Sequence, residues 1–499
     1  MSLIRRILGS AAALLVLLGA LSYASIVAPS FGIEVGSAVR SAEQSVKAPN
    51  LQVVCPGGAI RSGGASGTRL GEFDQSGSAE VNAIDWLRTA TLQTKALAGI
   101  SGAPTSASTG VPDRVGRATL LEVDDPTGKL EQGSQLLSAS QLQLQNAANF
   151  SGLLAASCEQ PAAEHWFVGG DTTVGREALM VVVNPSQVDA QIDIAAFSNG
   201  GQVKVDGLAG LSVPAGRTLI VPLASSLVNQ ATLTLRLTAS GGAVAAWIQQ
   251  RVVRGTIPGG SDFIAPSTEL AKSLVIPGLM LRGTADAAAI IKTRPAYADQ
   301  TPMLRIFVPA DSTGAKTITV TAQLFGSTAN TFGTVLRQTV TTGTTTDVPL
   351  TGLADGDYVA FVSADRPIRA AIRLPRTNKT KSPATDFAWL QAGASLKGIR
   401  AFQVPRSGIT RLSLGNPAKT PVKIAIGSPQ QVSSATAPVV TLAAGEVRSI
   451  GLTAGALVWL KTDSDAPRAN LVIDVDSAVA TLPITDYKNL GSKLQVSVR

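Results

Sequence analysis

The sequence predicts an all-β protein, in which an N-terminal transmembrane helix precedes tandem β-sandwich modules. Short alternating runs rich in Thr, Val, Ser, Gly and Pro are typical of many short strands joined by tight turns. Four sequence marks recur three times in the same order, and one uncharged apolar run stands near the N-terminus. With 45% hydrophobic and only 15% charged residues, the 499-residue chain can bury several cores.

The first element is the apolar run from Ile7 to Ala28, which follows the pair Arg5-Arg6. A helix of this length, at about 1.5 Å per residue, crosses a hydrocarbon core of roughly 30 Å. The arginines predict residues 1–6 in the cytoplasm, residues 7–28 as a signal anchor in the cell membrane, and the bulk of the chain outside. A cleaved signal peptide is the alternative, with Ser22-Tyr23-Ala24 as its site and a secreted protein as the result.

Two regions lie between the anchor and the repeats. Residues 29–50 have few strong apolar side chains and are predicted to be a linker, and residues 51–164 alternate strand-like runs with long Gly/Ser stretches. The latter are predicted to form a loop-rich β-domain related to the modules. Cys55 and Cys158 are the two cysteines of the chain, and an even count outside the cytoplasm predicts one disulfide.

The rest of the chain repeats one unit three times. Each copy has an apolar strand ending in Gly or Pro, a strand that runs into a Pro turn, an eleven-residue piece with Gly at its fourth position, and an Asp-containing triplet near its end. The glycines of the third mark are 127 and 102 residues apart, and the aspartates are 124 and 100 apart. We therefore predict modules at 165–267, 268–390 and 391–499.

Within each copy, apolar positions alternate with a period of two, so a hairpin has one apolar face that must pack against a second sheet. Six to eight such strands in roughly 90 residues fit an immunoglobulin-like β-sandwich. The repeated marks predict three further features: positive φ at the glycines, core positions for the leucines, and local backbone hydrogen bonds for the aspartates. The residues concerned are Gly216, Gly343 and Gly445; Leu223, Leu350 and Leu452; Asp262, Asp386 and Asp486.

The chain offers little for catalysis or metal binding. His165 is its single histidine, no Gly-x-Ser-x-Gly elbow occurs, and a zinc site of His and Cys ligands cannot be assembled. Paired carboxylates of a glycoside hydrolase would come from Asp85, Asp171 or Asp124-Asp125, of which the last is better explained as a turn. We predict no catalytic residue, no cofactor and no metal site.

The formal charge is +8, but the cations are scattered and only 4% of the residues are aromatic, which argues against nucleic acid as a partner. One stretch concentrates charge, and its strand 368–374 has apolar even positions. A solvent-facing row of guanidiniums suits an anionic wall polymer or a lipid, and the alternative is an edge strand that cations protect from pairing. The arginines of this stretch are Arg366, Arg369, Arg373 and Arg376, followed by Lys379 and Lys381.

The segments around Cys158, His165-Trp166-Phe167-Val168-Gly169-Gly170 and Val183-Asn184-Pro185 resemble an uncharacterised actinobacterial family of secreted or membrane-anchored envelope proteins, a domain of unknown function. The resemblance implies an envelope location and no catalytic residue. We expect a non-enzymatic scaffold or binding module in envelope assembly, with a wall polymer, a lipid-linked glycan or a membrane glycosyltransferase as its partner. The alternatives are a carbohydrate-active enzyme with a site in 51–165 and an accessory subunit of a membrane glycosyltransferase.

Overall fold

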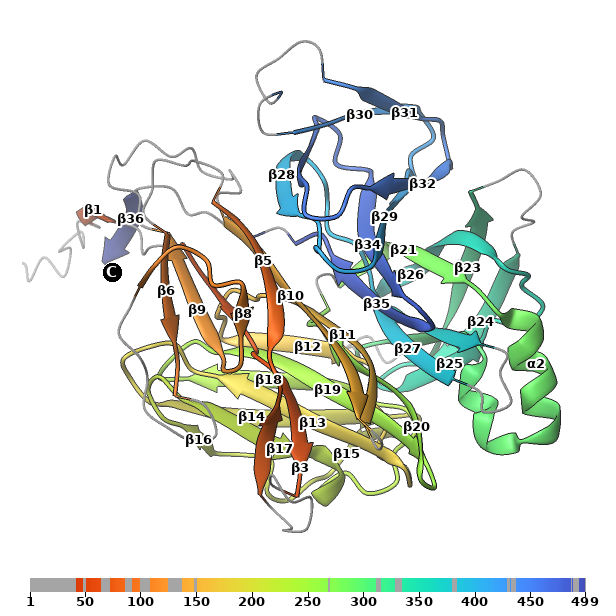
Figure 1. Ribbon diagram of the computed structural model, residues 1–499, viewed down its shortest axis with the longest axis horizontal. Coiled ribbons are helices and arrows are strands. Elements are labelled where there is room, and N and C mark those ends of the chain that lie inside the picture. The colour runs from red at the N-terminus through yellow and green to blue at the C-terminus, as the bar shows by residue number, and fades with distance from the viewer. Residues whose placement is uncertain are drawn as a thin grey trace, which may run out of the picture. The chain divides into compact units, whose positions relative to one another are not determined.

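The chain is built mostly from antiparallel strands, which confirms the predicted β class (Figure 1). The computed structural model describes residues 42–47, 51–63, 72–85, 92–98, 108–123, 137–147, 150–267, 270–310, 316–327, 334–378, 384–428, 431, 437–485, 487 and 493–498. The predicted cytoplasmic residues and anchor, 1–28, lie outside this set. Among the described residues, no helix has the length and apolar character needed to cross a membrane.

The described residues form two units. In the smaller unit, β1 (Ala42–Lys47) pairs antiparallel with β36 (Lys493–Val498), so the end of the predicted linker is a strand. The larger unit spans residues 48–492 and contains every other element.

The N-terminal domain of the larger unit has two four-stranded sheets. Its strands are β2 (Leu51–Cys55), β3 (Ala59–Ser62), β4 (Phe73–Ser76), β5 (Ala79–Asp85), β6 (Leu92–Ala96), β7 (Ser108–Thr109), β8 (Arg114–Val115), β9 (Thr119–Val123), β10 (Leu137–Ala147) and β11 (Phe150–Ser157). The sheet orders are β2-β9-β6-β7 and β11-β10-β5-β8, with β3 and β4 as a separate hairpin. The predicted disulfide between Cys55 and Cys158 is present, and it joins the end of β2 to the residue after β11.

The first module follows the same plan. Its elements are β12 (Glu164–Val168), β13 (Arg176–Val183), β14 (Ala190–Ser198), β15 (Gly201–Val203), β16 (Leu211–Val213), β17 (Thr218–Pro222), η1 (Leu223–Ser225), β18 (Thr234–Ser240), β19 (Ala245–Arg254) and β20 (Ile257–Ile264). One sheet has the order β12-β18-β14-β15, with β16 also on β14, and the other has the order β17-β13-β19-β20.

The second module contains one very long strand and the helical insertion. Its elements are β21 (Ala271–Leu281), α2 (Thr284–Thr293), η2 (Pro295–Gln300), β22 (Met303–Phe307), β23 (Thr317–Gly326), β24 (Val335–Thr341), β25 (Thr345–Pro349), β26 (Gly356–Asn378) and β27 (Ala384–Gln391). The first half of β26 pairs with β21 and β23, and its second half pairs with β22 and β27. A single strand therefore passes through both layers of this module.

The third module again has two four-stranded sheets. Its strands are β28 (Gly398–Gln403), β29 (Ile409–Gly415), β30 (Val422–Gly427), β31 (Val439–Leu442), β32 (Val447–Leu452), β33 (Leu457–Thr462), β34 (Arg468–Val475) and β35 (Ala478–Pro483). Their orders, β28-β33-β30-β31 and β32-β29-β34-β35, match those of the preceding modules and of the N-terminal domain. The exact module boundaries stay a prediction.

The repeated glycine occupies the same connection in each copy. The φ angles of Gly216, Gly343 and Gly445 are +67°, +77° and +70°, which confirms the predicted conformation. In the N-terminal domain, Gly110 (φ +92°) lies in the equivalent connection, between β7 and β8. Open space surrounds the Cβ position of Gly216 and of Gly445, so the backbone angle rather than crowding requires glycine there.

The repeated leucines differ in burial. Leu223 and Leu350 are buried in their cores, as predicted, whereas Leu452 is half-buried at the margin of its core. The cores are also shared between modules: Phe387 and Trp389 of the second module belong to the core of the first. Neighbouring sandwiches are therefore not independent of one another.

We expect Leu223→Ala to lower the free energy of unfolding by about 2–5 kcal/mol, because it opens a cavity in a packed core. Leu452→Ala should lower it by about 1 kcal/mol, because that side chain is already partly solvated. Urea unfolding followed by near-ultraviolet circular dichroism measures both. Loss of one module at low urea, with the other modules intact, would contradict the shared cores.

Candidate ligand-binding site

Four edge strands meet in the described part of the larger unit, one from each sandwich. β11 contacts β20, β20 contacts β27, β27 contacts β35, and β35 contacts β11. Each is the outermost strand of its sheet, so its outward N–H groups have no partner within that sheet. The aspartates of the repeated triplet lie on two of these strands.

Asp386, on β27, binds the other three strands. Its Oδ1 accepts a hydrogen bond from Ser261 N at 3.1 Å, and its Oδ2 accepts from Leu153 N and from Val479 N, both at 3.0 Å. Burial raises the pKa of Asp386 to about 7, although these hydrogen bonds act to lower it. Asp386 therefore binds backbone N–H groups as predicted, but the predicted local bonding is wrong for these three partners, which belong to other modules.

The neighbouring aspartate is more isolated. Asp262, on β20, accepts a hydrogen bond from Trp389 N at 2.7 Å through Oδ2, while its buried Oδ1 has no partner. Burial raises its pKa well above the ordinary range, and the charge of Asp386 raises it further. The third aspartate, Asp486, lies outside the described residues.

The predicted row of solvent-facing arginines is wrong for Arg369, Arg373 and Arg376. In the second half of β26, most residues on both faces of the strand are buried. The guanidinium of Arg369 lies 5.0 Å from the Trp166 ring of the first module, and Arg373 lies 3.3 Å from Asp299. Arg366 is half-buried, and Lys379 and Lys381 lie outside the described residues.

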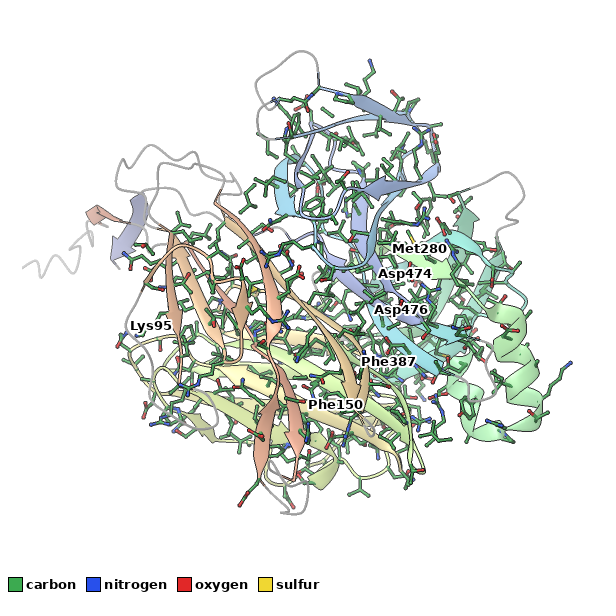
Figure 2. The ribbon with its side chains drawn as sticks, in the orientation of Figure 1. Lys95, Phe150, Met280, Phe387, Asp474 and Asp476 are labelled. Atoms are coloured by element: carbon green, nitrogen blue, oxygen red, sulfur yellow. A yellow bond between two sulfur atoms is a disulfide. The ribbon has the colours of Figure 1, made fainter. Side chains whose placement is uncertain are left out.

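Arg376 joins the second module to the third. Its Nη1 donates to the Met280 carbonyl oxygen at 3.2 Å, and its Nη2 binds Asp474 Oδ1. Figure 2 labels Met280 and Asp474, which lie close together although they come from different modules. The side chain is 5% exposed, so contact of Arg376 with a large polymer would require the modules to separate.

The remaining predicted residues have structural roles. His165 is buried on β12, its Nε2 lies 2.7 Å from the Val244 carbonyl oxygen, and burial lowers its pKa. Asp171 accepts hydrogen bonds from Thr173 N and Oγ1, at 2.8 and 2.6 Å, and so closes a turn. Asp124, Asp125 and the side chain of Asp85 lie outside the described residues. The part of the chain that the structure describes contains no cluster of His, Cys, Asp and Glu suited to a metal.

The structure instead directs attention to the helical insertion of the second module. The Ala-rich α2 begins after Gly283 and ends before Pro295, and Ala287 is its one buried residue. Asp355 holds its N-terminus: its carboxylate accepts from Gly283 N and Thr284 N at 2.9 Å and from Thr284 Oγ1 at 2.7 Å. Burial alone would raise the pKa of Asp355, but these hydrogen bonds lower it.

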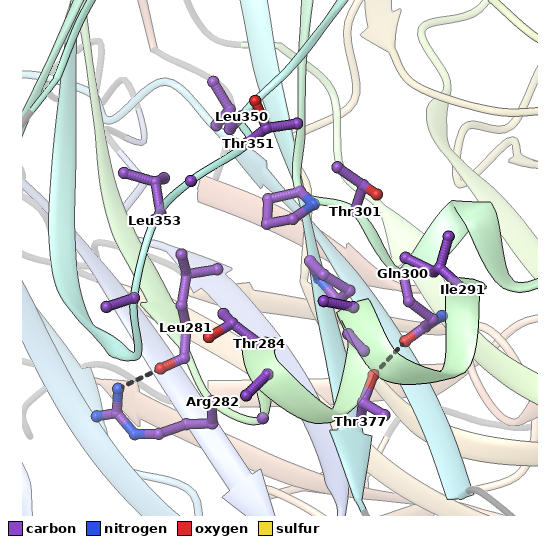
Figure 3. Close-up of a pocket in the computed structure, with 18 residues that line it drawn as sticks. Leu281, Arg282, Thr284, Ile291, Gln300, Thr301, Leu350, Thr351, Leu353 and Thr377 are labelled. Atoms are coloured by element: carbon purple, nitrogen blue, oxygen red, sulfur yellow. Dashed lines mark hydrogen bonds between the residues drawn. The ribbon is translucent and has the colours of Figure 1, made fainter. Parts of the chain in front are cut away.

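A pocket of about 520 Å³ lies between α2, β26 and the 350–354 loop (Figure 3). Its walls are mostly apolar and include Leu281, Ala288, Ile291, Leu350 and Leu353. The helix contributes small alanines where a leucine would fill the space. This volume lies within the range of about 300–1,000 Å³ that small-molecule sites occupy.

A few polar groups line the same pocket. The Gln300 side-chain amide and Thr377 Oγ1 are joined by a hydrogen bond of 2.9 Å, and Gln300 is 1% exposed (Figure 3). Thr284, Thr301 and Thr351 add hydroxyl groups to the lining. The pocket therefore suits a ligand with an apolar body and a few hydrogen-bonding groups.

Sequence reasoning missed this pocket, although one signal was present. The interval between the repeated glycines is 25 residues longer across the second module (127 against 102), and α2 with η2 lies within that interval. The interval indicated extra residues. It did not indicate a helix, because the run of alanines has no distinct apolar stripe.

A family model described as a family of unknown function, DUF5719, matches residues 112–454. The chain belongs to this family. No curated protein matches the chain. Among solved structures, the chain is similar to an anti-sigma factor domain-containing protein from Clostridium clariflavum, with 9% identity over 80% of this chain and 100% of that chain. The TM-score is 0.11, so this likeness carries no argument about the DUF5719 fold or function.

The pKa of Asp386 predicts a pH-dependent stability. Between about pH 4 and pH 7 the folded protein keeps a proton that the unfolded chain has released, so the free energy of unfolding falls as pH rises through this window. The loss attributable to Asp386 is up to about 4 kcal/mol. Urea unfolding from pH 4 to pH 8 measures it.

Two matched variants test the slope of the free energy of unfolding against pH. Asp386→Asn should lose the part of this slope that Asp386 contributes. Asp206→Asn should keep it, because Asp206 is exposed. Asparagine also leaves backbone donors imperfectly paired, so Asp386→Asn should be less stable at every pH. The slope, rather than the absolute stability, is therefore the readout. An Asp386→Asn slope equal to that of the wild type would contradict the assignment.

Proposed function

We propose that the protein is a membrane-anchored scaffold of the cell envelope that binds a ligand outside the cytoplasm and catalyses no reaction. In this proposal residues 7–28 span the cell membrane, and tandem immunoglobulin-like sandwiches carry the binding site. The uncharged run behind Arg5-Arg6 supports the anchor. The disulfide between Cys55 and Cys158 supports an oxidising compartment.

Support for a scaffold comes from the way the sandwiches are joined. Asp386 ties four edge strands together, and Arg305 of the second module donates to the Gly170 and Ala231 carbonyl oxygens of the first, at 2.6 and 2.8 Å. Arg406 of the third module binds Asp113 of the N-terminal domain at 2.7 Å. Such contacts between modules favour a rigid body over a flexible string of domains.

The observation that carries the binding role is the pocket beneath α2. It lies in the second module, where an insertion adds a helix that leaves space beneath itself. A structural insertion would be expected to fill its own underside, because empty apolar space forfeits contacts. The apolar walls suit the hydrocarbon part of a membrane lipid or of a lipid-linked glycan.

The test uses the full-length protein in phosphatidylcholine nanodiscs and a photoreactive diazirine alkane, with labelled peptides mapped by mass spectrometry. We expect labelling of α2 and of the 350–354 loop. Ala288→Phe, which fills the pocket, should reduce this labelling about tenfold. Ala289→Phe is the matched control, since it places the same ring on the same helix outside the pocket lining.

Labelling that is equal in the two variants would contradict a ligand in this pocket. So would a wild-type protein that is labelled only in residues 7–28. Circular dichroism of each variant checks that α2 and the sheets remain folded.

A further inference from the structure

A second cleft is lined by the same insertion, where it meets the first module. Its volume is about 710 Å³, and it lies between the 173–176 turn, the β19–β20 turn and residues 294–297. An adjoining cleft of about 460 Å³ shares Gly175, Arg176, Val253 and Gly255 with it. These four residues therefore line both clefts.

The charges behind this cleft do not balance. One carboxylate, Asp299, is contacted by three guanidiniums, those of Arg176 at 2.9 Å, Arg254 at 2.5 Å and Arg373 at 3.3 Å. The three arginine side chains are 14%, 4% and 14% exposed. A second carboxylate, Asp171, lies 3.8 Å from Arg176. Three cations therefore face two anions, which leaves one positive charge in a largely buried cluster.

Asp299 keeps the cluster assembled. Burial alone would raise the pKa of Asp299, but Arg373 and Arg254 lower it below the ordinary value, so the carboxylate stays ionised at neutral pH. Arg254 is held further by the Ala296 carbonyl oxygen at 3.1 Å and by Thr385 Oγ1 at 3.0 Å. The guanidiniums are thus fixed before any ligand arrives.

The lining adds further groups that favour an anion. Arg294 is exposed, and its side chain makes no hydrogen bond or ion pair with any residue that the structure describes. The Tyr297 ring lies 4.3 Å from the Arg254 guanidinium, and its hydroxyl group is buried without a partner. Glu177, which lines the adjoining cleft, is neutralised by Arg251 at 2.9 Å.

An uncompensated buried cation is unfavourable, and an anionic ligand removes that penalty. Guanidiniums match the geometry of phosphate oxygens and bind them through paired hydrogen bonds. We propose that this cleft binds a phosphate-bearing group through hydrogen bonds from Arg176 and Arg294, with the buried charge of Arg254 behind them. The excess charge of the cluster together with Arg294 matches the charge of a phosphate dianion or of two neighbouring phosphodiesters. This site does not depend on the pocket beneath α2.

Two sources supply this chemistry, a wall polymer and a lipid headgroup, and the test separates them. Full-length protein in phosphatidylcholine nanodiscs is immobilised for biolayer interferometry. The probes are poly(glycerol phosphate) and monomeric dihexanoylphosphatidylglycerol, with dihexanoylphosphatidylcholine as the zwitterionic reference. Arg294→Gln should weaken binding about tenfold, because it removes one charged hydrogen-bond donor. Arg337→Gln, an exposed arginine of the same module outside the cleft, should leave binding unchanged.

Binding of the polymer alone assigns a wall polymer, and binding of the anionic lipid alone assigns a headgroup; both support the site. Equal affinities of Arg294→Gln and Arg337→Gln would overturn it, as would a wild-type protein that binds neither probe. Because Arg294 is exposed, its replacement leaves the fold intact. The readout is also separate from diazirine labelling beneath α2, so failure of one proposal is distinguishable from failure of the other.

Discussion

The assembly depends on one buried carboxylate. Edge strands carry N–H groups that a sheet cannot satisfy by itself, and burying such a group without an acceptor costs about 1–3 kcal/mol. Asp386 supplies acceptors to β11, β20 and β35 at once, from its own place on β27. Close approach is possible because Gly152 and Gly260 have no side chains; a Cβ at either would lie 2.8 or 2.5 Å from Asp386 Oδ1. Four edge strands that could otherwise pair with strands of other molecules thereby contact one another.

Several arginines of the chain form contacts between modules. Arg305, Arg376 and Arg406 each bind groups of a neighbouring module, and Arg305 also forms a bidentate pair with Asp347 at 2.7 and 2.8 Å. Arginine suits these positions because its planar fork serves carbonyl and carboxylate oxygens together. These three arginines therefore act between sandwiches, each beside a carboxylate, which contrasts with the excess of cations around Asp299.

Local features of the fold were predictable from the sequence, and features that depend on packing between modules were not. Alternation with a period of two identifies strands and the face that is buried. The positive φ of Gly216 depends on its own turn, and the burial of Leu223 depends on the core of its own module. The same alternation placed Arg369 on a solvent-facing side of its strand, but only the tertiary structure shows that Trp166 of the first module lies against it. Asp386 was predicted to bond to local backbone, because no sequence pattern brings together positions 153, 261, 386 and 479. The pocket escaped prediction for a related reason: its wall is a helix with one buried residue.

The insertion is held by charge at both ends and only weakly by its core contacts. At its start, Asp355 binds the backbone of Gly283 and Thr284, and at its end Asp299 is bound by arginines of two modules. A helix fixed in this way does not have to pack tightly beneath itself, so its alanines can leave the pocket open. Between the two sites, Gln300 contacts Thr377 on the pocket side, and its amide, turned to satisfy both of its ends, accepts from Arg254 Nη2 at 3.1 Å. The anchoring that keeps the apolar pocket open is therefore the same anchoring that arranges the arginines of the cleft.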